Sequence, residues 1–201
     1  MLRFVLATAN LDKAAEIEAV LVAGGAPVTL ESRDPSLPEV EETGATLEEN
    51  ARLKAIDACQ RTGLPAIADD TGLEVAALGG APGVRSARFA GEDASYEDNV
   101  RLLLERLRDV PEPGRTARFA TVAIARWPDG LEVAALGTVE GSIALDPRGS
   151  RGFGYDPVFV PDEGDGRTFA EMQPAEKHAC SHRGRAFRTL ADGLRILSES
   201  A

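Results

Sequence analysis

The sequence predicts an α/β protein in which helices pack against a mixed β-sheet. Two observations carry this prediction. In the first part of the chain, short apolar runs typical of buried strands alternate with stretches whose apolar residues recur at helical spacing. Further along, a long hairpin pattern precedes a last strand and a last helix. The expected order is therefore βαβα, a hairpin, then βα.

The first three elements form a strand, a helix and a strand. The apolar run at 2–7 predicts a buried strand. Asn10 is a favourable N-cap for the helix that follows, which the glycines at 24–25 end. A second strand is expected at 27–30. The helix is expected to bury the face formed by Ala14, Ile17, Val20 and Leu21.

A long acidic loop at 33–45 leads into the second helix. Thr46 and Glu49 have the spacing of a capping box, which predicts that a helix begins there. The helix is expected to run to about Thr62, where Gly63 ends it.

The middle of the chain contains a strand and a third capped helix. Residues 66–68 predict a strand that enters Asp69-Asp70-Thr71-Gly72. The pattern at 73–78 fits a strand and a short helix equally well. Glycine and proline at 79–91 predict a loop, and a capping box opens a helix over 95–108.

The rest of the chain begins with a hairpin. Strands at 118–127 and 131–139 flank the turn Pro128-Asp129-Gly130. Ser181 is expected to cap the last helix, 182–197, whose buried face carries Ala186, Leu190, Leu194 and Leu197. The other expected elements are strands at 143–145 and 158–160 and a glycine-rich loop at 149–156.

Length and charge restrict the kind of protein. The 201 residues suit one domain, or one domain with two lobes, and no internal repeat or linker divides them. The formal net charge is −11, and no dense run of lysine and arginine is present. Such a chain repels nucleic-acid backbones. It can still bind a small anion through a local cationic pocket or a metal.

The expected location is the cytoplasm. Cys59 and Cys180 lie far apart and match no metal-binding spacing, which argues against a disulfide framework or a zinc site. The apolar start of the chain is short and turns polar at once, as a strand does and a signal peptide does not. The longest apolar runs are too short to span a membrane.

The segment Thr8-Ala9-Asn10-Leu11-Asp12-Lys13 is a candidate anion site. A helix begins there, and the free N–H groups of a helix start attract anions. A lysine in the first turn opposes the helix dipole unless an anion lies nearby. The alternative is a capped helix with a solvated lysine, and this segment alone favours it. The segment lacks the glycines of a P-loop.

Several carboxylates could hold a divalent cation. Asp69 and Asp70 follow a buried strand, where successive side chains point to opposite faces, so they cannot easily share one role. Glu39, Glu41 and Glu42 lie in the acidic loop, and hard oxygen ligands of this kind suit Mg²⁺. The alternatives are a common Asp-Asp-x-Gly turn and a solvated acidic loop.

Asn50 and Lys54 share a face of the second helix and could reach phosphate oxygens. By spacing alone, an ordinary exposed face is the favoured alternative.

The second group of candidates lies near the end of the chain. In Phe153-Gly154-Tyr155-Asp156 an aromatic ring could stack on a base, or could equally anchor the loop in the core. Two cations and a histidine, Lys177, His182 and Arg183, are expected to gather at the start of the last helix, where they would suit an anion or a carbonyl-rich ligand. A histidine near a helix cap on the surface is the alternative for His182.

The joint pattern of these segments resembles the noncanonical purine NTP pyrophosphatases, also called the inosine triphosphate pyrophosphatase family. The matching segments occur in the family's order and cover nearly the whole chain. They are LATANLDK (6–13), EETGATLEENARLKA (41–55), PAIADDTGLEV (65–75), LGGAPGVRSARFAG (78–91), GFGYDPVF (152–159) and AEKHACSHRGRA (175–186). Ala9 stands where the family prefers glycine, and Thr71 stands where serine is commoner. Both substitutions keep the chemistry, a small residue and a hydroxyl.

The resemblance implies an elongated mixed sheet with helices, in two lobes around a central cleft, and a homodimer. It also implies hydrolysis of a nucleoside triphosphate, with a 6-oxo purine base, to the monophosphate and pyrophosphate. The expected substrates are ITP, dITP and XTP. Acidic surroundings with a cation-lined pocket would suit a small anion and its metal.

The resemblance also implies a role for each candidate residue. Mg²⁺ is expected on Asp70 and Glu42, although the residues alone do not decide between Glu42 and its neighbours Glu39 and Glu41. Asp70 is expected to orient or deprotonate the attacking water, and Asp69 to support it. The residues expected to bind the phosphates are Thr8, Ala9, Asn10, Leu11, Asp12, Lys13, Lys54 and Thr71. Those expected at the base and sugar are Phe153, which stacks on the base, Gly154, Tyr155, Asp156, Lys177, His182 and Arg183.

Two other functions stay open. One is a related pyrophosphatase for modified pyrimidines, which the segment from Phe153 to Asp156 with His182 and Arg183 disfavours. The other is a nucleotide-binding protein without enzymatic activity, which predicts loss of acidic residues that this chain retains.

Overall fold

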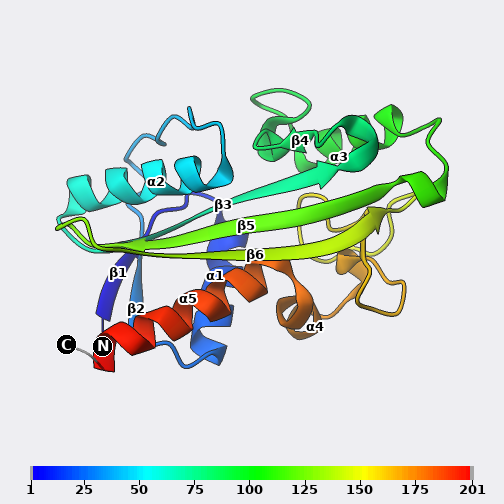
Figure 1. Cartoon of the computed structure of the whole chain (residues 1–201). Helices are drawn as coiled ribbons and strands as arrows, with labels where there is room; N and C mark the ends of the chain where they lie inside the picture. Colours follow the sequence, from blue (N-terminus) through cyan, green and yellow to red (C-terminus); the bar gives the residue numbers. More distant parts are fainter. Residues whose placement is uncertain (1, 200–201) are drawn as a thin grey trace. The chain divides into compact units, whose positions relative to one another are not determined.

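The computed structural model describes residues 2–199, which form a seven-stranded sheet and five α-helices (Figure 1). The strands are β1 (Leu2–Leu6), β2 (Val28–Ser32), β3 (Ala66–Val75), β4 (Pro82–Gly83), β5 (Thr116–Arg126), β6 (Glu132–Ile143) and β7 (Phe159–Pro161). The helices are α1 (Leu11–Ala23), α2 (Leu47–Thr62), α3 (Tyr96–Arg106), α4 (Pro174–Cys180) and α5 (His182–Glu199). The predicted α/β class is confirmed.

The sheet is mixed, as predicted. Its strand order is β2-β1-β3-β5-β6-β7, and β4 pairs with β3. Strand β1 is parallel to both β2 and β3, whereas β4 and β7 are antiparallel to β3 and β6. The turn of the predicted hairpin closes between β5 and β6, where the Trp127 amide donates to the Leu131 carbonyl at 2.9 Å.

The chain folds into two compact units. In the part that the structure describes, unit 1 comprises residues 2–70, 121–137 and 183–199. Unit 2 comprises Thr71–Ala120 and Thr138–His182. Strands β3, β5 and β6 each contribute residues to both units. Each unit has a hydrophobic core of its own.

The larger core of unit 1 lies between β1, α1 and α5. Helix α1 begins where the sequence predicts, because the Asn10 side chain accepts a hydrogen bond from the Lys13 amide. Helix α5 also begins at the predicted residue, and three of the four residues of its expected face are fully buried, while Leu197 is half-buried. The buried residues of this core include Phe4, Leu6, Ile17, Leu21, Ile67, Phe187, Leu190 and Leu194.

Helix α2 packs through small side chains, which allow it to approach the sheet closely. The predicted capping box of Thr46 and Glu49 is present, and Gly63 ends the helix in the left-handed conformation. Burial raises the pKa of the Cys59 thiol on its inner face. The residues of this second core of unit 1 are Ala7, Ala51, Ala55, Ala58, Cys59, Ala66, Ala68 and Ile124.

The core of unit 2 is aromatic at its centre. Phe119, Phe159 and Phe169 lie in mutual contact, with ring centroids 4.7 to 6.3 Å apart. Aromatic pairs at such separations add to the stabilisation that burial alone provides. Helix α3, capped by Ser95 as predicted, contributes Val100 and Leu103 to this core.

Two local predictions are wrong, and one helix was not predicted. Strand β3 runs on through Asp69-Asp70-Thr71-Gly72 to Val75, because it pairs with β5 and, beyond the aspartates, with β4. Strand β6 continues to Ile143, so 143–145 is not a separate strand. Helix α4 was not predicted, although Pro174 at its first position and Glu176 at its third are start signals.

No helix within residues 2–199 combines the length and the apolar character needed to cross a membrane.

The glycine-rich loop at 149–156 depends on Gly149 for a close approach. Its φ is +81°, and a Cβ there would lie 2.3 Å from the carbonyl carbon of Ala170. We expect Gly149→Ala to lower the free energy of unfolding by more than about 2 kcal/mol, because both the backbone strain and the clash must be relieved.

Gly166→Ala is the matched control, because Gly166 has a φ of +83° and no atom within 4 Å of an added Cβ. We expect a cost of about 1 kcal/mol there, from conformational strain alone. Urea unfolding of both variants measures the difference. Equal losses in the free energy of unfolding would show that the close approach of Gly149 to Ala170 does not exclude a Cβ atom.

Candidate active site

The segment between β1 and α1 forms one side of a cavity in unit 1. The Thr8 hydroxyl accepts a hydrogen bond from the Asn10 amide at 3.2 Å. The cavity has a volume of about 340 Å³, and Arg33 and Glu39 of the acidic loop line its other side. Of the predicted phosphate-binding residues, Thr8, Ala9 and Leu11 line this cavity. Asp12 is exposed in the first turn of α1.

Asp69 and Asp70 are adjacent in β3, are both buried, and contact different helices. Asp69 is 1% exposed, and its Oδ2 lies 3.5 Å from Lys13 Nζ of α1 and 3.7 Å from Arg183 Nε of α5. Asp70 Oδ1 lies 2.9 Å from Lys54 Nζ of α2. Side chains alternate along a strand, so the two carboxylates meet cations from opposite faces of the sheet. Figure 1 shows α2 on one face and α1 and α5 on the other. The solvated-turn alternative is wrong.

Lys54 joins two carboxylates. Its Nζ lies 3.0 Å from Glu42 Oε1 and 2.9 Å from Asp70 Oδ1. Asn50, which shares this face of α2 as predicted, donates to Asp70 Oδ2 at 3.4 Å. Among the three glutamates of the acidic loop, Glu42 therefore contacts this cluster, whereas Glu39 lines the cavity beside Thr8. The alternative of an ordinary exposed face for Asn50 and Lys54 is wrong.

Burial and charge act against each other in this cluster. Burial lowers the pKa of Lys54, but the carboxylates of Asp70, Asp69 and Glu42 outweigh it and raise that pKa to about 12. Burial raises the pKa of Asp70, although Lys54 and Lys13 oppose the shift. Burial also lowers the pKa of Lys13, against the attraction of Asp69. Lys54 is thus firmly cationic, and Asp70 is a stronger base than an ordinary aspartate.

Cations in the first turn of a helix need a nearby anion, and the protein supplies it. Lys13 in the first turn of α1 meets Asp69. Arg183 in the first turn of α5 meets Asp69 and, at 2.5 Å, Glu16. These carboxylates offset the unfavourable helix dipole. Glu16 did not figure among the predicted residues, because its position within a helix interior gives no local signal.

Glu42 and Asp70 supply part of the ligands that Mg²⁺ requires, and water or substrate phosphates would complete them. Within the described residues, no group of three or more histidine, cysteine or acidic residues is placed to hold a metal. Glu42 and Asp70 do approach a single cation, the Lys54 ammonium. Mg²⁺ commonly binds one or two carboxylates together with substrate phosphates and water. Two hard oxygen ligands, with water or phosphate oxygens beside them, therefore fit Mg²⁺.

In unit 2, Asp156 and Lys177 form a buried ion pair beside Phe153. Their Oδ2 and Nζ atoms are 2.5 Å apart, and both side chains are nearly inaccessible. Asp156 also accepts a hydrogen bond from the Phe153 amide at 2.9 Å. The Lys177 ammonium lies over the Phe153 ring, 5.1 Å from its centroid, as a cation–π contact requires.

Lys177 lies in α4 rather than at the start of α5, contrary to the prediction. It occupies the last turn of α4, where a cation is favourable to the helix dipole. The helix-dipole argument that its position suits an anion or a carbonyl-rich ligand is therefore wrong. Its anionic partner is Asp156.

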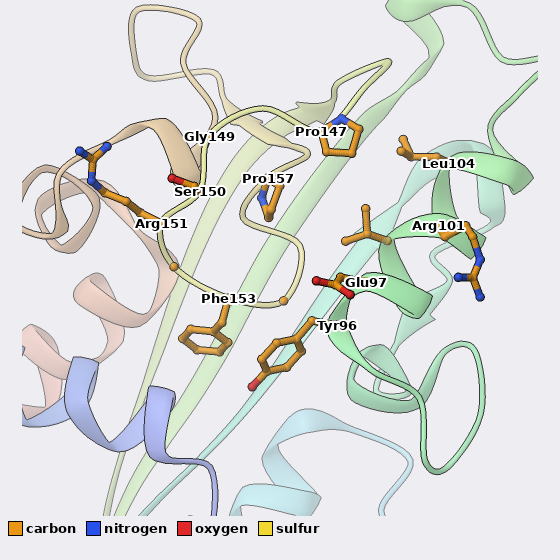
Figure 2. Close-up of a pocket in the computed structure, with 13 residues that line it drawn as sticks. Tyr96, Glu97, Arg101, Leu104, Pro147, Gly149, Ser150, Arg151, Phe153 and Pro157 are labelled. Atoms are coloured by element: carbon orange, nitrogen blue, oxygen red, sulfur yellow. The ribbon is translucent and has the colours of Figure 1, made fainter.

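The ring of Phe153 borders a cavity of about 520 Å³ in unit 2 (Figure 2). Tyr96, at the first position of α3, lies beside it with the ring centroids 5.6 Å apart. Gly154, with a φ of +62°, follows Phe153 along the same cavity. Tyr96 was not predicted, since an aromatic residue at a helix start is no specific signal.

Tyr155 and His182 are buried in unit 2. The Tyr155 hydroxyl donates to the Ser86 carbonyl at 2.9 Å, and burial raises its pKa. The His182 ring stacks on Phe119 at 4.3 Å. The alternative of a surface histidine is therefore wrong for His182. Thr71, half-buried, follows Asp70 in β3.

The buried pair of Asp156 and Lys177 gives a stability test. We expect Lys177→Met to lower the free energy of unfolding by about 3 to 5 kcal/mol, because it leaves the Asp156 carboxylate buried without its cation. Chemical denaturation measures the change. Adding Asp156→Asn to this variant is expected to recover part of the loss, because the uncompensated charge is removed.

Arg167→Met is the control, since Arg167 also pairs with a carboxylate, that of Glu176 at 2.9 Å, but this ion pair is solvent-exposed. We expect a much smaller change there. Similar losses in both variants would contradict a special role for burial at Asp156.

Comparison with known proteins places the chain in a family. The family model described as the Ham1 family matches residues 4–193. A protein from Mycolicibacterium paratuberculosis named dITP/XTP pyrophosphatase is 50% identical over 198 residues, which are 97% of each chain. A protein of the same name from Shigella flexneri is 48% identical over 97% of this chain and 99% of its own.

Solved structures agree with this assignment. The structure of a HAM1 protein from Coxiella burnetii is 41% identical and superimposes with a TM-score of 0.86, over 99% of this chain and 100% of the other. The Staphylococcus aureus Ham1 protein is 37% identical, with a TM-score of 0.82 over 96% and 98% of the two chains. The protein described here belongs to the Ham1 family.

Proposed function

We propose that this protein hydrolyses noncanonical purine nucleoside triphosphates, namely ITP, dITP and XTP, to the monophosphate and pyrophosphate. It thereby removes these nucleotides from the nucleotide pool. This activity is supported by the relatives named dITP/XTP pyrophosphatase, which are 50% and 48% identical to this protein over nearly the full chain. The observation in the structure that carries it is the buried cluster in which Lys54 joins Glu42 to Asp70.

The triphosphate is assigned to unit 1. The start of α1 offers backbone N–H groups, with Thr8 and Asn10 before it, and these suit phosphate oxygens. Lys54 and Lys13 add positive charge, and Ala9, Leu11 and Asp12 lie in the same segment as Lys13. Phosphoryl transfer depends mainly on positioning and on neutralisation of charge, which these groups supply. The expected phosphate contact of Thr71, which belongs to unit 2, stays a prediction.

Asp70 is assigned to the attacking water and, with Glu42, to Mg²⁺. Bound Mg²⁺ supplies neutralisation of charge on the triphosphate oxygens. The raised pKa of Asp70 suits a general base. Asn50 and Lys54 orient its carboxylate, and Asp69 supports it by holding Lys13 and Arg183 in place.

The base is assigned to the residues around Phe153 in unit 2. A base stacks on the Phe153 ring. Lys177 has three donors and no acceptor, so its ammonium can donate to a 6-oxo group but offers nothing to a 6-amino group. Asp156 holds Lys177 and the Phe153 amide in place, and a mismatch of donors discriminates strongly in such a site.

The remaining residues have supporting roles in this assignment. Tyr155 anchors the loop through Ser86, and His182 stacks on Phe119 in the core of unit 2. The expected contacts of Arg183 and Gly154 with the base or sugar stay predictions. The arrangement as one domain with two lobes, the homodimer and the cytoplasmic location also stay predictions. Sedimentation at micromolar concentration tests the dimer.

The first experiment measures pyrophosphate release from ITP, dITP, XTP, ATP, GTP, CTP and UTP, with Mg²⁺ and with EDTA. We expect metal-dependent release from ITP, dITP and XTP, and a loss of kcat of about 100-fold or more in Asp70→Asn, because that change removes the base and a metal ligand. Release from pyrimidine triphosphates would overturn the base assignment. No release from any substrate would favour a binding protein without activity.

A pair of neighbouring variants tests the metal ligand. We expect Glu42→Gln to raise the Mg²⁺ concentration needed for half-maximal rate by about tenfold or more, because a neutral amide binds Mg²⁺ far more weakly than a carboxylate does. Glu41→Gln, one residue away and with the same change of charge, serves as control and is expected to leave this value nearly unchanged. An equal effect of both variants would contradict the assignment of Glu42.

A further inference from the structure

We propose that Lys54 is an exchangeable counter-ion. Its ammonium occupies the place between Glu42 and Asp70 when no metal is bound, and it moves from these carboxylates to the substrate phosphates when the metal binds. The inference rests on the proposed function, because it takes Glu42 and Asp70 as the metal ligands. The inference adds to that function that metal binding must displace the Lys54 ammonium.

The geometry supports a shared position. The Lys54 ammonium lies at nearly equal distances, 3.0 and 2.9 Å, from one oxygen of Glu42 and one of Asp70. Two carboxylates that approach one cation from two sides form the arrangement that a divalent cation also requires. A metal that bound the same two oxygens would compete directly with the ammonium.

Charge and burial explain why the place is not left empty. The side chains of Lys54, Glu42 and Asp70 are only 13%, 23% and 7% exposed. Two poorly solvated carboxylates side by side repel each other unless a cation lies between them. Lys54 therefore keeps the acidic loop with Glu42 next to β3 before substrate and metal arrive.

The nature of lysine explains why the cation can leave. Lysine carries a compact point charge on a flexible four-carbon stem with three rotatable donors. An ammonium released from the carboxylates by a metal can turn toward an anion nearby without movement of α2. Lys13, by contrast, lies by Asp69 on the other face of the sheet, and its contact does not involve Glu42 or Asp70 oxygens.

The test measures the affinity for Mn²⁺ alone, without nucleotide, by electron paramagnetic resonance of free Mn²⁺ at mildly alkaline pH. We expect Lys54→Met to bind Mn²⁺ about tenfold more tightly than the unaltered protein, because a competing charge in direct contact with both ligands is lost. The same variant is expected to lose kcat/KM for ITP, since the phosphates lose a cation.

Two variants serve as controls. Arg52→Gln removes a positive charge from the same helix, but its partners are Glu48 and Glu132, so we expect unchanged Mn²⁺ affinity. Lys54→Arg keeps the charge and is expected to bind Mn²⁺ as the unaltered protein does. If Lys54→Met does not fold, as judged by circular dichroism, Lys54→Gln takes its place.

Weaker Mn²⁺ binding by Lys54→Met would overturn the inference, because it would mean that Lys54 only holds Glu42 in position. Equal affinity, or no detectable binding by either protein, would overturn it as well. These results are independent of turnover. Failure of the unaltered protein to hydrolyse ITP would count against the proposed function and not against the exchange of Lys54.

Discussion

The burial of two consecutive carboxylates in the middle of β3 is the constraint on which the rest of unit 1 depends. Asp69 and Asp70 are almost inaccessible to solvent, and an ionised carboxylate in that position must be paired with a cation. The strand alternation directs the two side chains to opposite faces, so one helix on each face has to bring a lysine. Lys54 of α2 and Lys13 of α1 meet this requirement, and Arg183 of α5 adds to it. The three helices are thus tied to the sheet by charge as well as by apolar packing.

Unit 2 also contains a buried carboxylate that is paired with a lysine. Asp156 and Lys177 are buried together, and the carboxylate also binds the Phe153 amide. A pair of this kind contributes little net stability but is costly to break, so it holds one local arrangement against others. In unit 1 the paired groups are those assigned to the phosphates and the metal, and in unit 2 they border the aromatic ring assigned to the base. Each ion pair therefore fixes the position of polar side chains that apolar packing alone could not hold.

Local signals in the sequence account for most element starts. Asn10, Thr46 and Ser95 cap helices as predicted, since a side-chain oxygen at that position satisfies an amide one turn away. Gly63 ends α2 as predicted, because glycine readily adopts the left-handed conformation required at a helix C-terminus. The extension of β3 could not be predicted in the same way. Asp-Asp-Thr-Gly has the composition of a turn, and the pairing of β3 with β5 and with the Pro82–Gly83 segment, which no local pattern shows, keeps the strand extended.

By itself, the sequence determined the α/β class, the helix caps and the acidic overall charge. It also determined the family resemblance, which identified the candidate residues as parts of one site. These properties reside in short segments, in composition or in the joint order of motifs. Only the tertiary structure decided which carboxylate meets which cation. It joined Glu42 rather than Glu39 to Lys54, placed Lys177 on Asp156 and turned the Tyr155 hydroxyl into the core. The physical reason is that ion pairing and burial depend on distances between segments far apart in the chain, which no local pattern encodes.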